Sequence, residues 1–195
     1  MKKNQCLVIG TAITAIIFAF LILGSSTVSG IQKIDTTGQM HLGNPDSPVK
    51  VVLFIDFRCT GCRQFEEQVF PLIKRRYIDT GKIDYTVIPL AFISGSQRLS
   101  EGYFCTRQQN PTLGQAYIEQ VYQSNTVPVL PGINAEQLST CIGSAGASTY
   151  LERNRTIADH AMGRKVYTPS VFVNGKRVSY PNYTSVSNAI DEAMK

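Results

Sequence analysis

Two cysteines separated by two residues, Cys59 and Cys62, are placed to do redox chemistry in this 195-residue chain. They follow an apolar run and precede a segment with helical periodicity, so Cys59 is expected at the start of a helix. Unpaired backbone N–H groups and the positive end of the helix dipole favour the thiolate form of a cysteine there. Cys62 would lie one turn further on, close enough to form a disulfide with Cys59. The pair could therefore exchange two electrons with the thiols of another protein.

The elements that position this pair are a strand and a helix. Residues 51–55 (VVLFI) form a continuous apolar run, typical of a strand buried on both faces. After the cysteines, apolar residues recur every three or four positions as far as Leu72, which predicts a helix that Pro71 should kink. A strand followed by a helix that begins with Cys-x-x-Cys favours a thioredoxin-like redox site over a zinc site.

The rest of the chain predicts a second strand, a block of helices, a hairpin and a last helix. The strand is expected over 82–90, and the helices over 97–109, 113–124, from 134 through Cys141, and 147–164. An Asn174-Gly175 turn predicts a hairpin between 170–173 and 176–179, and the last helix follows over 185–194. This order indicates an α/β, thioredoxin-like fold with a helical domain, about residues 95–165, inserted between the central strand and the hairpin.

The first 30 residues have the parts of a secretory signal peptide. Lys2 and Lys3 precede an apolar run over 7–23, and small residues follow up to Gly30. We expect cleavage after residues 28–30 (VSG), although an apolar run of this length is at the short edge of a membrane span, and an uncleaved anchor is the alternative. The remainder is expected in the periplasm or at the extracytoplasmic face of a bacterial membrane. Residues 31–47 would be a linker, and 48–195 the folded domain.

Export affects the interpretation of the other cysteines. Of the five cysteines, Cys6 lies in the leader, and Cys105 and Cys141 remain besides the reactive pair. In an oxidising compartment two such cysteines usually bond to each other, so we expect a structural Cys105–Cys141 disulfide. Two buried, unpaired thiols are the alternative. A four-cysteine zinc site would need distant thiols to converge, so no metal is expected.

Charge gives little support to other classes of function. The formal net charge is +5, from 19 Lys and Arg against 14 Asp and Glu, but the basic residues are scattered without interleaved aromatic residues. Nucleic-acid binding is therefore disfavoured. His41, in the expected linker, and His160, late in the fourth helix of the block, have no partner histidine at ligand spacing, so surface roles are expected.

Two segments resemble parts of a known family. Residues 59–67 (CTGCRQFEE), with the continuation 69–73 (VFPLI), resemble the active-site segment of the DsbA-like thiol–disulfide oxidoreductases. Residues 168–175 (TPSVFVNG) resemble the cis-proline loop and hairpin of the same family, and the similarity covers about 48–195.

The resemblance implies roles for particular residues. Cys59 would be the surface nucleophile and Cys62 the buried resolving thiol, with no cofactor besides their disulfide. Pro169 would be cis and pack against that disulfide, and the backbone of Thr168 would pair with the extended chain of a substrate. Thr60 and Gly61, between the cysteines, would complete the active-site loop.

Two departures from the family also have consequences. Thr60 and Gly61 include no histidine or proline, so the couple should be less oxidising than that of strongly oxidising relatives. Leu53 occupies the position where many members carry a buried acid. Asp56, Glu66 or Glu67 could substitute for that acid, but each is expected on a solvated face or as a helix-dipole residue. 

The sequence therefore predicts an exported, monomeric oxidoreductase that introduces disulfides into reduced or unfolded secreted or envelope proteins. A membrane partner of the DsbB type would reoxidise it. One alternative is a reductase or isomerase kept reduced by a membrane donor, and a second is a redox-inert chaperone or binding module.

Overall fold

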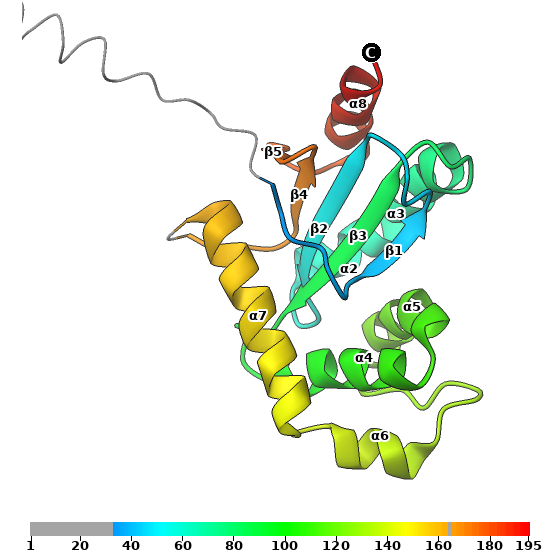
Figure 1. The fold of residues 1–195 in the computed structure, drawn as a ribbon, viewed down its shortest axis with the longest axis vertical. Coiled ribbons are helices and arrows are strands. Elements are labelled where there is room, and N and C mark those ends of the chain that lie inside the picture. Colours follow the sequence, from blue (N-terminus) through cyan, green and yellow to red (C-terminus); the bar gives the residue numbers. More distant parts are fainter. Residues whose placement is uncertain (1–32, 164) are drawn as a thin grey trace, which may run out of the picture. The chain divides into compact units, whose positions relative to one another are not determined.

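A computed structural model describes residues 33–163 and 165–195 of the chain (Figure 1). The expected leader, residues 1–30, lies outside the described residues. Within the described part of the chain, no helix is long and apolar enough to cross a membrane. The predicted order of strand, helix, strand, helical block, hairpin and helix is confirmed, with one further strand at the start.

A five-stranded sheet in the order β1–β3–β2–β4–β5 forms the centre of the fold. Its strands are β1 (Met40–Gly43), β2 (Lys50–Asp56), β3 (Asp84–Leu90), β4 (Ser170–Val173) and β5 (Lys176–Arg177). β2 runs parallel to β3 and antiparallel to β4, while β1 and β5 run antiparallel to their neighbours. Because β4 is antiparallel to β2, the loop that enters β4 lies beside the end of β2, where Cys59 follows.

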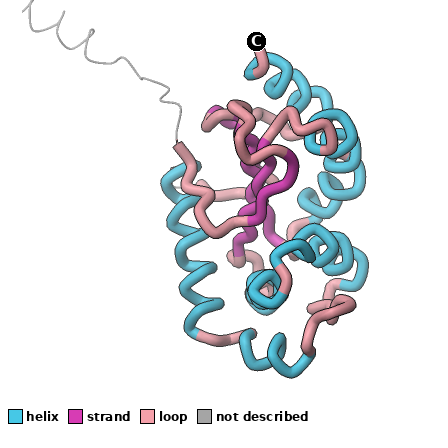
Figure 2. Tube along the Cα trace, turned by 45° about the vertical axis from the view of Figure 1, so that its right-hand side comes forward, coloured by secondary structure: helices cyan, strands magenta, loops and turns pink. Residues whose placement is uncertain are grey.

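Helices cover both faces of the sheet, and the side chains of β2 alternate between the two. Val51, Leu53 and Ile55 belong to the larger core, which α2 (Thr60–Gln68), α3 (Phe70–Ile73) and α8 (Tyr183–Ala193) help to complete. Val52 and Phe54 point to the other face, where α7 (Ala145–Met162) covers them. Successive side chains of a strand point to opposite faces, so a strand covered on both sides must be apolar throughout. In Figure 2 the strands accordingly lie between helices.

The helical block between β3 and β4 extends this core. Besides α7 it contains α4 (Gln97–Gln109), the short 3-10 helix η2 (Pro111–Leu113), α5 (Gly114–Ser124) and α6 (Ala135–Cys141). Phe57, just after β2, packs against three tyrosines of α4 and α5 with ring centroids 5.6, 5.8 and 6.0 Å away, namely Tyr122, Tyr117 and Tyr103. These aromatic contacts bind the inserted helices to the end of β2, directly before the reactive pair.

The helix that begins after Cys59 is interrupted where Pro71 predicts a kink. α2 ends at Gln68, α3 begins at Phe70, and a π-helix, η1 (Lys74–Ile78), continues the chain. Pro71 has no N–H to donate to the preceding turn, so the regular helix cannot run through this point. The π-helix has no counterpart in the sequence-based prediction.

The expectation that residues 31–47 are only a linker is wrong for residues 40–43. These residues form β1, which pairs with β3 so that Met40 lies opposite Val87, and Met40 is buried. Met40 and Leu42 alternate with His41 and Gly43, but four residues are a short run, and glycine is disfavoured in strands, so the local signal for a strand is weak. The conformation of β1 depends on pairing with β3 rather than on local preference.

Candidate active site

Cys59 caps the N-terminus of α2. Its backbone is extended (φ −79°, ψ 116°), and its sulfur accepts a hydrogen bond from the backbone N–H of Cys62 at 3.3 Å. The backbone N–H of Cys59 donates to the carbonyl of Asp56, which holds the turn between β2 and α2. The side chain of Cys59 is half-buried, so its sulfur can be reached from outside. The predicted position at a helix start is confirmed.

The second thiol has the opposite environment. Cys62 lies in the first turn of α2 and is 1% exposed. The pKa of Cys59 is lowered to about 6, first because the Cys62 thiol hydrogen-bonds to it, and then through Thr168 and the N–H groups of Cys62 and Gly61. Burial raises the pKa of Cys62 far above its ordinary value. Near neutral pH the reactive thiolate would therefore be at Cys59 and the proton at Cys62.

The loop before β4 completes the site from a distant part of the chain. The Thr168–Pro169 peptide bond is cis, and the Thr168 carbonyl accepts a hydrogen bond from the Cys59 thiol at 3.3 Å. A Cβ added at Gly61 would lie 3.2 Å from Cδ of Pro169, so glycine permits this close approach. Thr60 is exposed beside it. All the residues expected to form the reactive loop are thus brought together.

Asp56 organises the backbone beneath Cys59 and is fully buried, so the expectation of a solvated residue is wrong. Its carboxylate accepts hydrogen bonds from the backbone N–H groups of Arg58, Phe92 and Ile93 and from the Ser96 hydroxyl, at 2.9 to 3.1 Å. Three of these donors come from the loop between β3 and α4, which lies next to the end of β2. The sequence did not predict that contact. The carboxylate ties that loop to the active-site turn.

Glu66 is a second acid whose environment the sequence did not predict. Its carboxyl is largely buried against α5, where the Gln115 amide donates to it, and its pKa is raised to about 7, chiefly by burial. Glu67, in contrast, is exposed as expected. Tyr122 of α5 is also buried next to the site, and its hydroxyl donates to the Asp56 carbonyl at 3.3 Å. No local pattern identifies α5 as part of the site, since it contributes only through packing.

The other two cysteines of the described residues belong to the helical block rather than to the active-site turn. Cys105 of α4 and Cys141 at the end of α6 are joined by a disulfide with an S–S distance of 2.02 Å. Neither cysteine is at a strand-to-helix junction. Their position makes this disulfide a link within the helical block.

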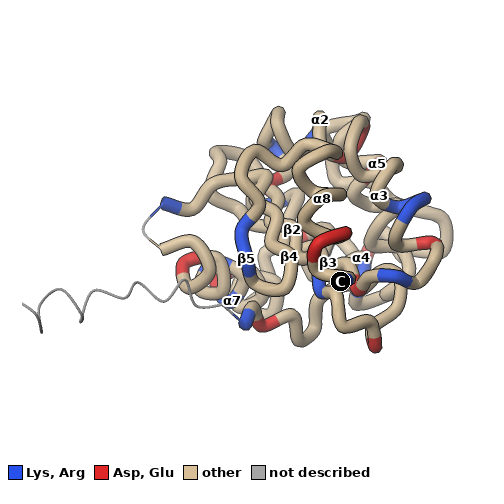
Figure 3. Tube along the Cα trace, turned by 90° about the horizontal axis from the view of Figure 1, so that it is seen from above, with Lys and Arg blue, Asp and Glu red and all other residues tan. Residues whose placement is uncertain are grey.

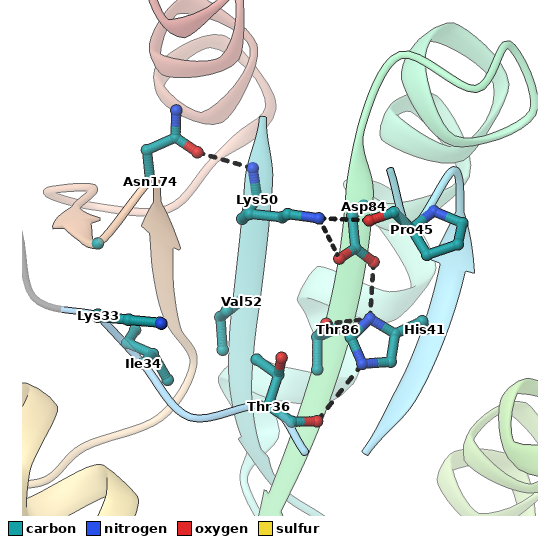
Figure 4. A pocket seen from close by; sticks show the side chains of 11 residues that line it. Lys33, Ile34, Thr36, His41, Pro45, Lys50, Val52, Asp84, Thr86 and Asn174 are labelled. Atoms are coloured by element: carbon teal, nitrogen blue, oxygen red, sulfur yellow. Dashed lines mark hydrogen bonds and ion pairs between the residues drawn. The ribbon is translucent and has the colours of Figure 1, made fainter. Parts of the chain in front are cut away.

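A recess at the opposite end of β2 contains a charged cluster but no thiol (Figure 4). The buried Asp84 carboxylate accepts from Nδ1 of His41 at 2.7 Å and from Nζ of Lys50 at 3.1 Å. His41 is an exposed residue, as expected, but it belongs to β1 rather than to a linker, and its side chain is paired with Asp84. β2 has seven residues, so about 20 Å separate its ends. These contacts link β1 and β2 to β3 at one end of the sheet, far from the two cysteines.

Elsewhere the charged residues are distributed as the sequence indicates. In the view from above, Lys and Arg occupy separate positions around the molecule, with Asp and Glu between several of them (Figure 3). His160 is exposed on α7. In residues 33–163 and 165–195, no group of three or more His, Cys, Asp or Glu side chains is arranged to hold a metal ion.

Known proteins match this chain over nearly the whole described region. Residues 35–192 match the model of a family described as thioredoxin. A Bacillus anthracis protein named probable disulfide bond formation protein D is 31% identical over 208 residues, covering 97% of this chain and 91% of that protein. Disulfide bond formation protein D of Bacillus subtilis is 25% identical over 190 residues, covering 88% and 83%.

Solved structures show the same architecture. BdbD from Bacillus subtilis, in its oxidised form, superposes with a TM-score of 0.74 at 21% identity, covering 83% of this chain and 96% of that one. DsbA of Chlamydia trachomatis gives a TM-score of 0.70 at 23% identity, covering 85% and 95%. The predicted thioredoxin-like fold with a helical insertion is confirmed.

Proposed function

We propose that this chain, which belongs to the thioredoxin family and is a DsbA-like protein thiol–disulfide oxidoreductase, acts outside the cytoplasm and introduces disulfides into secreted or envelope proteins. The observation that carries the proposal is the contrast between Cys59, half-buried with a lowered pKa, and Cys62, buried with a raised pKa. One thiol is suited to meet a substrate, and the other to resolve the intermediate.

The reaction would proceed through a mixed disulfide. A substrate thiolate attacks Sγ of Cys59, the Cys59–Cys62 bond breaks, and Cys62 leaves with the bonding electron pair and takes up a proton. A second thiolate of the substrate then attacks the substrate sulfur of the mixed disulfide and releases Cys59 as a thiolate. The substrate loses two electrons and gains a disulfide, and the enzyme is left as a dithiol.

The environment of Cys59 favours this direction. A lowered pKa stabilises the reduced enzyme and makes Cys59 a good leaving group, and both effects make the disulfide a better oxidant. The cis-Pro169 loop supports substrate binding, because Thr168 presents its backbone directly beside the nucleophile. An extended substrate segment could pair with that backbone as an added strand.

The cellular setting follows from the oxidase role. The substrates would be reduced or unfolded exported proteins, and the protein would act as a monomer in the periplasm or at the extracytoplasmic face of a bacterial membrane. Residues 1–30 would direct export, with cleavage preferred to retention as an anchor. A membrane protein of the DsbB type would take the two electrons and restore the Cys59–Cys62 disulfide.

A reductase or isomerase is the second candidate, and one observation favours it. Between Cys59 and Cys62, Thr60 and Gly61 contribute no imidazole, and Thr60 is exposed. The thiolate is therefore held by backbone groups, the Cys62 thiol and Thr168. Without a cationic partner between the cysteines, the reduced form is stabilised less than in a strongly oxidising couple.

The equilibrium redox potential of the pair distinguishes these roles. We would equilibrate the full chain in glutathione buffers, quench with acid, alkylate the free thiols and quantify the two states by mass. A potential near that of DsbA, about −120 mV, supports the oxidase. A potential near that of thioredoxin, about −270 mV, supports the reductase or isomerase instead.

A second experiment tests the residue roles. The wild type should accelerate disulfide formation in reduced, unfolded ribonuclease with oxidised glutathione as the terminal oxidant. Cys59→Ala should abolish this acceleration, while Cys62→Ala should accumulate a mixed disulfide with the substrate on non-reducing gels. Full activity of Cys59→Ala would contradict the proposal and indicate a redox-inert chaperone or binding module.

A further inference from the structure

Two arginine side chains lie next to Cys59 at the start of α2. Arg58 directly precedes Cys59 and is exposed, and its Nε donates to the Gly95 carbonyl at 3.4 Å. Arg63 lies one turn further along α2, and its Nη2 donates to Oδ1 of Asn125 at 2.6 Å. The first guanidinium group is therefore held by the loop before α4, and the second by the end of α5.

A third arginine contacts the cis-proline loop. The Arg177 guanidinium stacks on the ring of Tyr167, with its Cζ 3.6 Å from the ring centroid, and Nη2 donates to the Ser170 hydroxyl at 3.2 Å. Tyr167 and Ser170 are the residues on either side of the cis Thr168–Pro169 bond. Arg177 therefore carries a positive charge to the backbone segment that would pair with a substrate.

No carboxylate neutralises these three charges within the described part of the chain. Arg58, Arg63 and Arg177 take part in none of its ion pairs. Their partners are a carbonyl, an amide, a hydroxyl and an aromatic ring, all of which are neutral. Other exposed cations, such as Lys74 and Arg155, do pair with acids. The positive charge around Cys59 is therefore available to a bound molecule.

The segments that surround Cys59 contain basic residues but neither Asp nor Glu. They are residues 57–63, 91–98, 121–127 and 165–178. Two acids do lie near the reactive pair, but neither presents a carboxylate at this surface. Asp56 is fully buried, and the Glu66 carboxyl is largely buried against α5, where the Gln115 amide donates to it. Arginine therefore sets the sign of the potential at the nucleophile.

Guanidinium groups recognise carboxylates. Their N–H donors form a planar fork that matches the two oxygens of an Asp or Glu side chain. A substrate segment paired with the backbone of Thr168 places the residues that flank its cysteine on both sides of Cys59, close to the three arginines. Acidic side chains at those positions are attracted, and basic ones are repelled.

We propose that Arg58, Arg63 and Arg177 select substrates by charge, so that the protein reacts preferentially with cysteines flanked by acidic residues. The arginines act on the encounter and on the mixed disulfide, and the bonds that form and break are still those at Cys59 and Cys62. The inference rests on the proposed function, because it names the class of substrate for the same site.

Coulomb's law gives the expected size of the effect. Arg58 is the chain neighbour of Cys59, so its guanidinium group lies within about 10 Å of the Cys59 sulfur. In water, a unit charge at this distance changes the rate of reaction with a singly charged reagent about twofold. Three such charges give about eightfold at low salt. Screening removes the effect in about 1 M salt, where the Debye length is about 3 Å.

The first test uses charged reagents and does not depend on redox activity. The reduced full chain is alkylated at about pH 8 in about 10 mM salt, either with iodoacetate, which is an anion, or with neutral iodoacetamide. Each rate is measured on the Cys59 peptide by mass. The iodoacetate rate divided by the iodoacetamide rate is independent of the thiolate fraction, since both reagents need the same thiolate.

The variants should change this ratio in a defined order. Arg58→Gln and Arg63→Gln should each lower it about twofold, and the double variant about fourfold. Arg58→Lys should keep the wild-type ratio, because it keeps the charge. Arg75→Gln removes an exposed arginine on η1, beyond the kink of the helix, and is the matched control with an unchanged ratio. In about 1 M salt all the proteins should give the same ratio.

The second test uses substrates. Three dithiol peptides differ only in carrying Glu, Gln or Lys on both sides of each cysteine, and the oxidised protein converts them to disulfides at low salt. Each initial rate is divided by the thiolate fraction of the peptide. The Glu peptide should react fastest and the Lys peptide slowest, and the difference should shrink about fourfold or more in the double variant of Arg58 and Arg63.

The contrary results separate the selectivity from the function on which it rests. An alkylation ratio that is equal in the wild type and the double variant at low salt overturns the inference. If the double variant fails to fold by circular dichroism, equal rates of the Glu and Lys peptides with the wild type overturn it instead. Peptides that are all oxidised at one rate refute only the selectivity. Peptides of which none is oxidised refute the proposed function, and the inference with it.

Discussion

The lowered pKa of Cys59 predicts a change in the pH dependence of the redox potential near pH 6. The disulfide form carries no thiol protons. The reduced form carries two below pH 6 and one above it, because the pKa of Cys59 is about 6 and that of Cys62 is raised far beyond this range. Each thiol proton changes the potential of a two-electron couple by about 30 mV per pH unit.

The magnitude follows from these proton counts. The potential should fall by about 59 mV per pH unit below pH 6 and by about 30 mV per pH unit above it. Between pH 6 and pH 8 the fall is about 70 mV, against about 120 mV for two thiols with ordinary pKa values. The lowered pKa thus raises the potential at pH 8 relative to an ordinary dithiol, and this gain is lost as the pH falls through 6.

The assay is a set of glutathione titrations at fixed pH values, with acid quenching and alkylation. As an independent check, the alkylation rate of Cys59 in the reduced protein should rise with a midpoint near pH 6. Cys62→Ala should move that midpoint to higher pH, because the hydrogen bond from the Cys62 thiol contributes most to the lowered pKa. A uniform slope of about 59 mV per pH unit up to pH 8 would refute the assignment of a thiolate to Cys59.

Two further predictions concern stability. A methyl group added at Gly102 would overlap the Tyr117 hydroxyl and lie 3.0 Å from Cγ1 of Val127, so Gly102→Ala should lower the free energy of unfolding by about 1–3 kcal/mol in urea titrations. Gly146→Ala is the matched control, because its added Cβ would meet only the Ser144 Oγ, at 3.9 Å. This variant should raise the free energy of unfolding by up to about 1 kcal/mol. Equal effects of the two substitutions would contradict the steric argument. The double replacement of Cys105 and Cys141 by alanine should lower the free energy of unfolding by about 2–4 kcal/mol. The oxidised protein should still react with glutathione at the wild-type rate. A lost reaction would show that the helical block does more than support the site.

The reactive pair and the order of elements could be predicted because their signals are local. The apolar run of β2 reflects burial on both faces of a central strand, and the spacing of Cys59 and Cys62 places one sulfur at a helix cap and the other inside the first turn. The helix α4 and the strand β4 have the predicted bounds for the same reason, since periodicity and turn residues act over a few positions.

Contacts between distant segments decided the rest. β1 is a strand because β3 offers it a partner, and Asp56 is buried because the loop after β3 returns N–H donors to its carboxylate. Glu66 and Glu67 are adjacent and chemically alike, yet α5 covers only the first. The sequence by itself therefore determined which two thiols form the candidate redox pair and on which elements they lie, because caps and periodicity are short-range properties. The burial of Asp56, and the backbone that faces Cys59 from 109 residues away, were decided only by tertiary packing, because burial depends on what the rest of the chain places there.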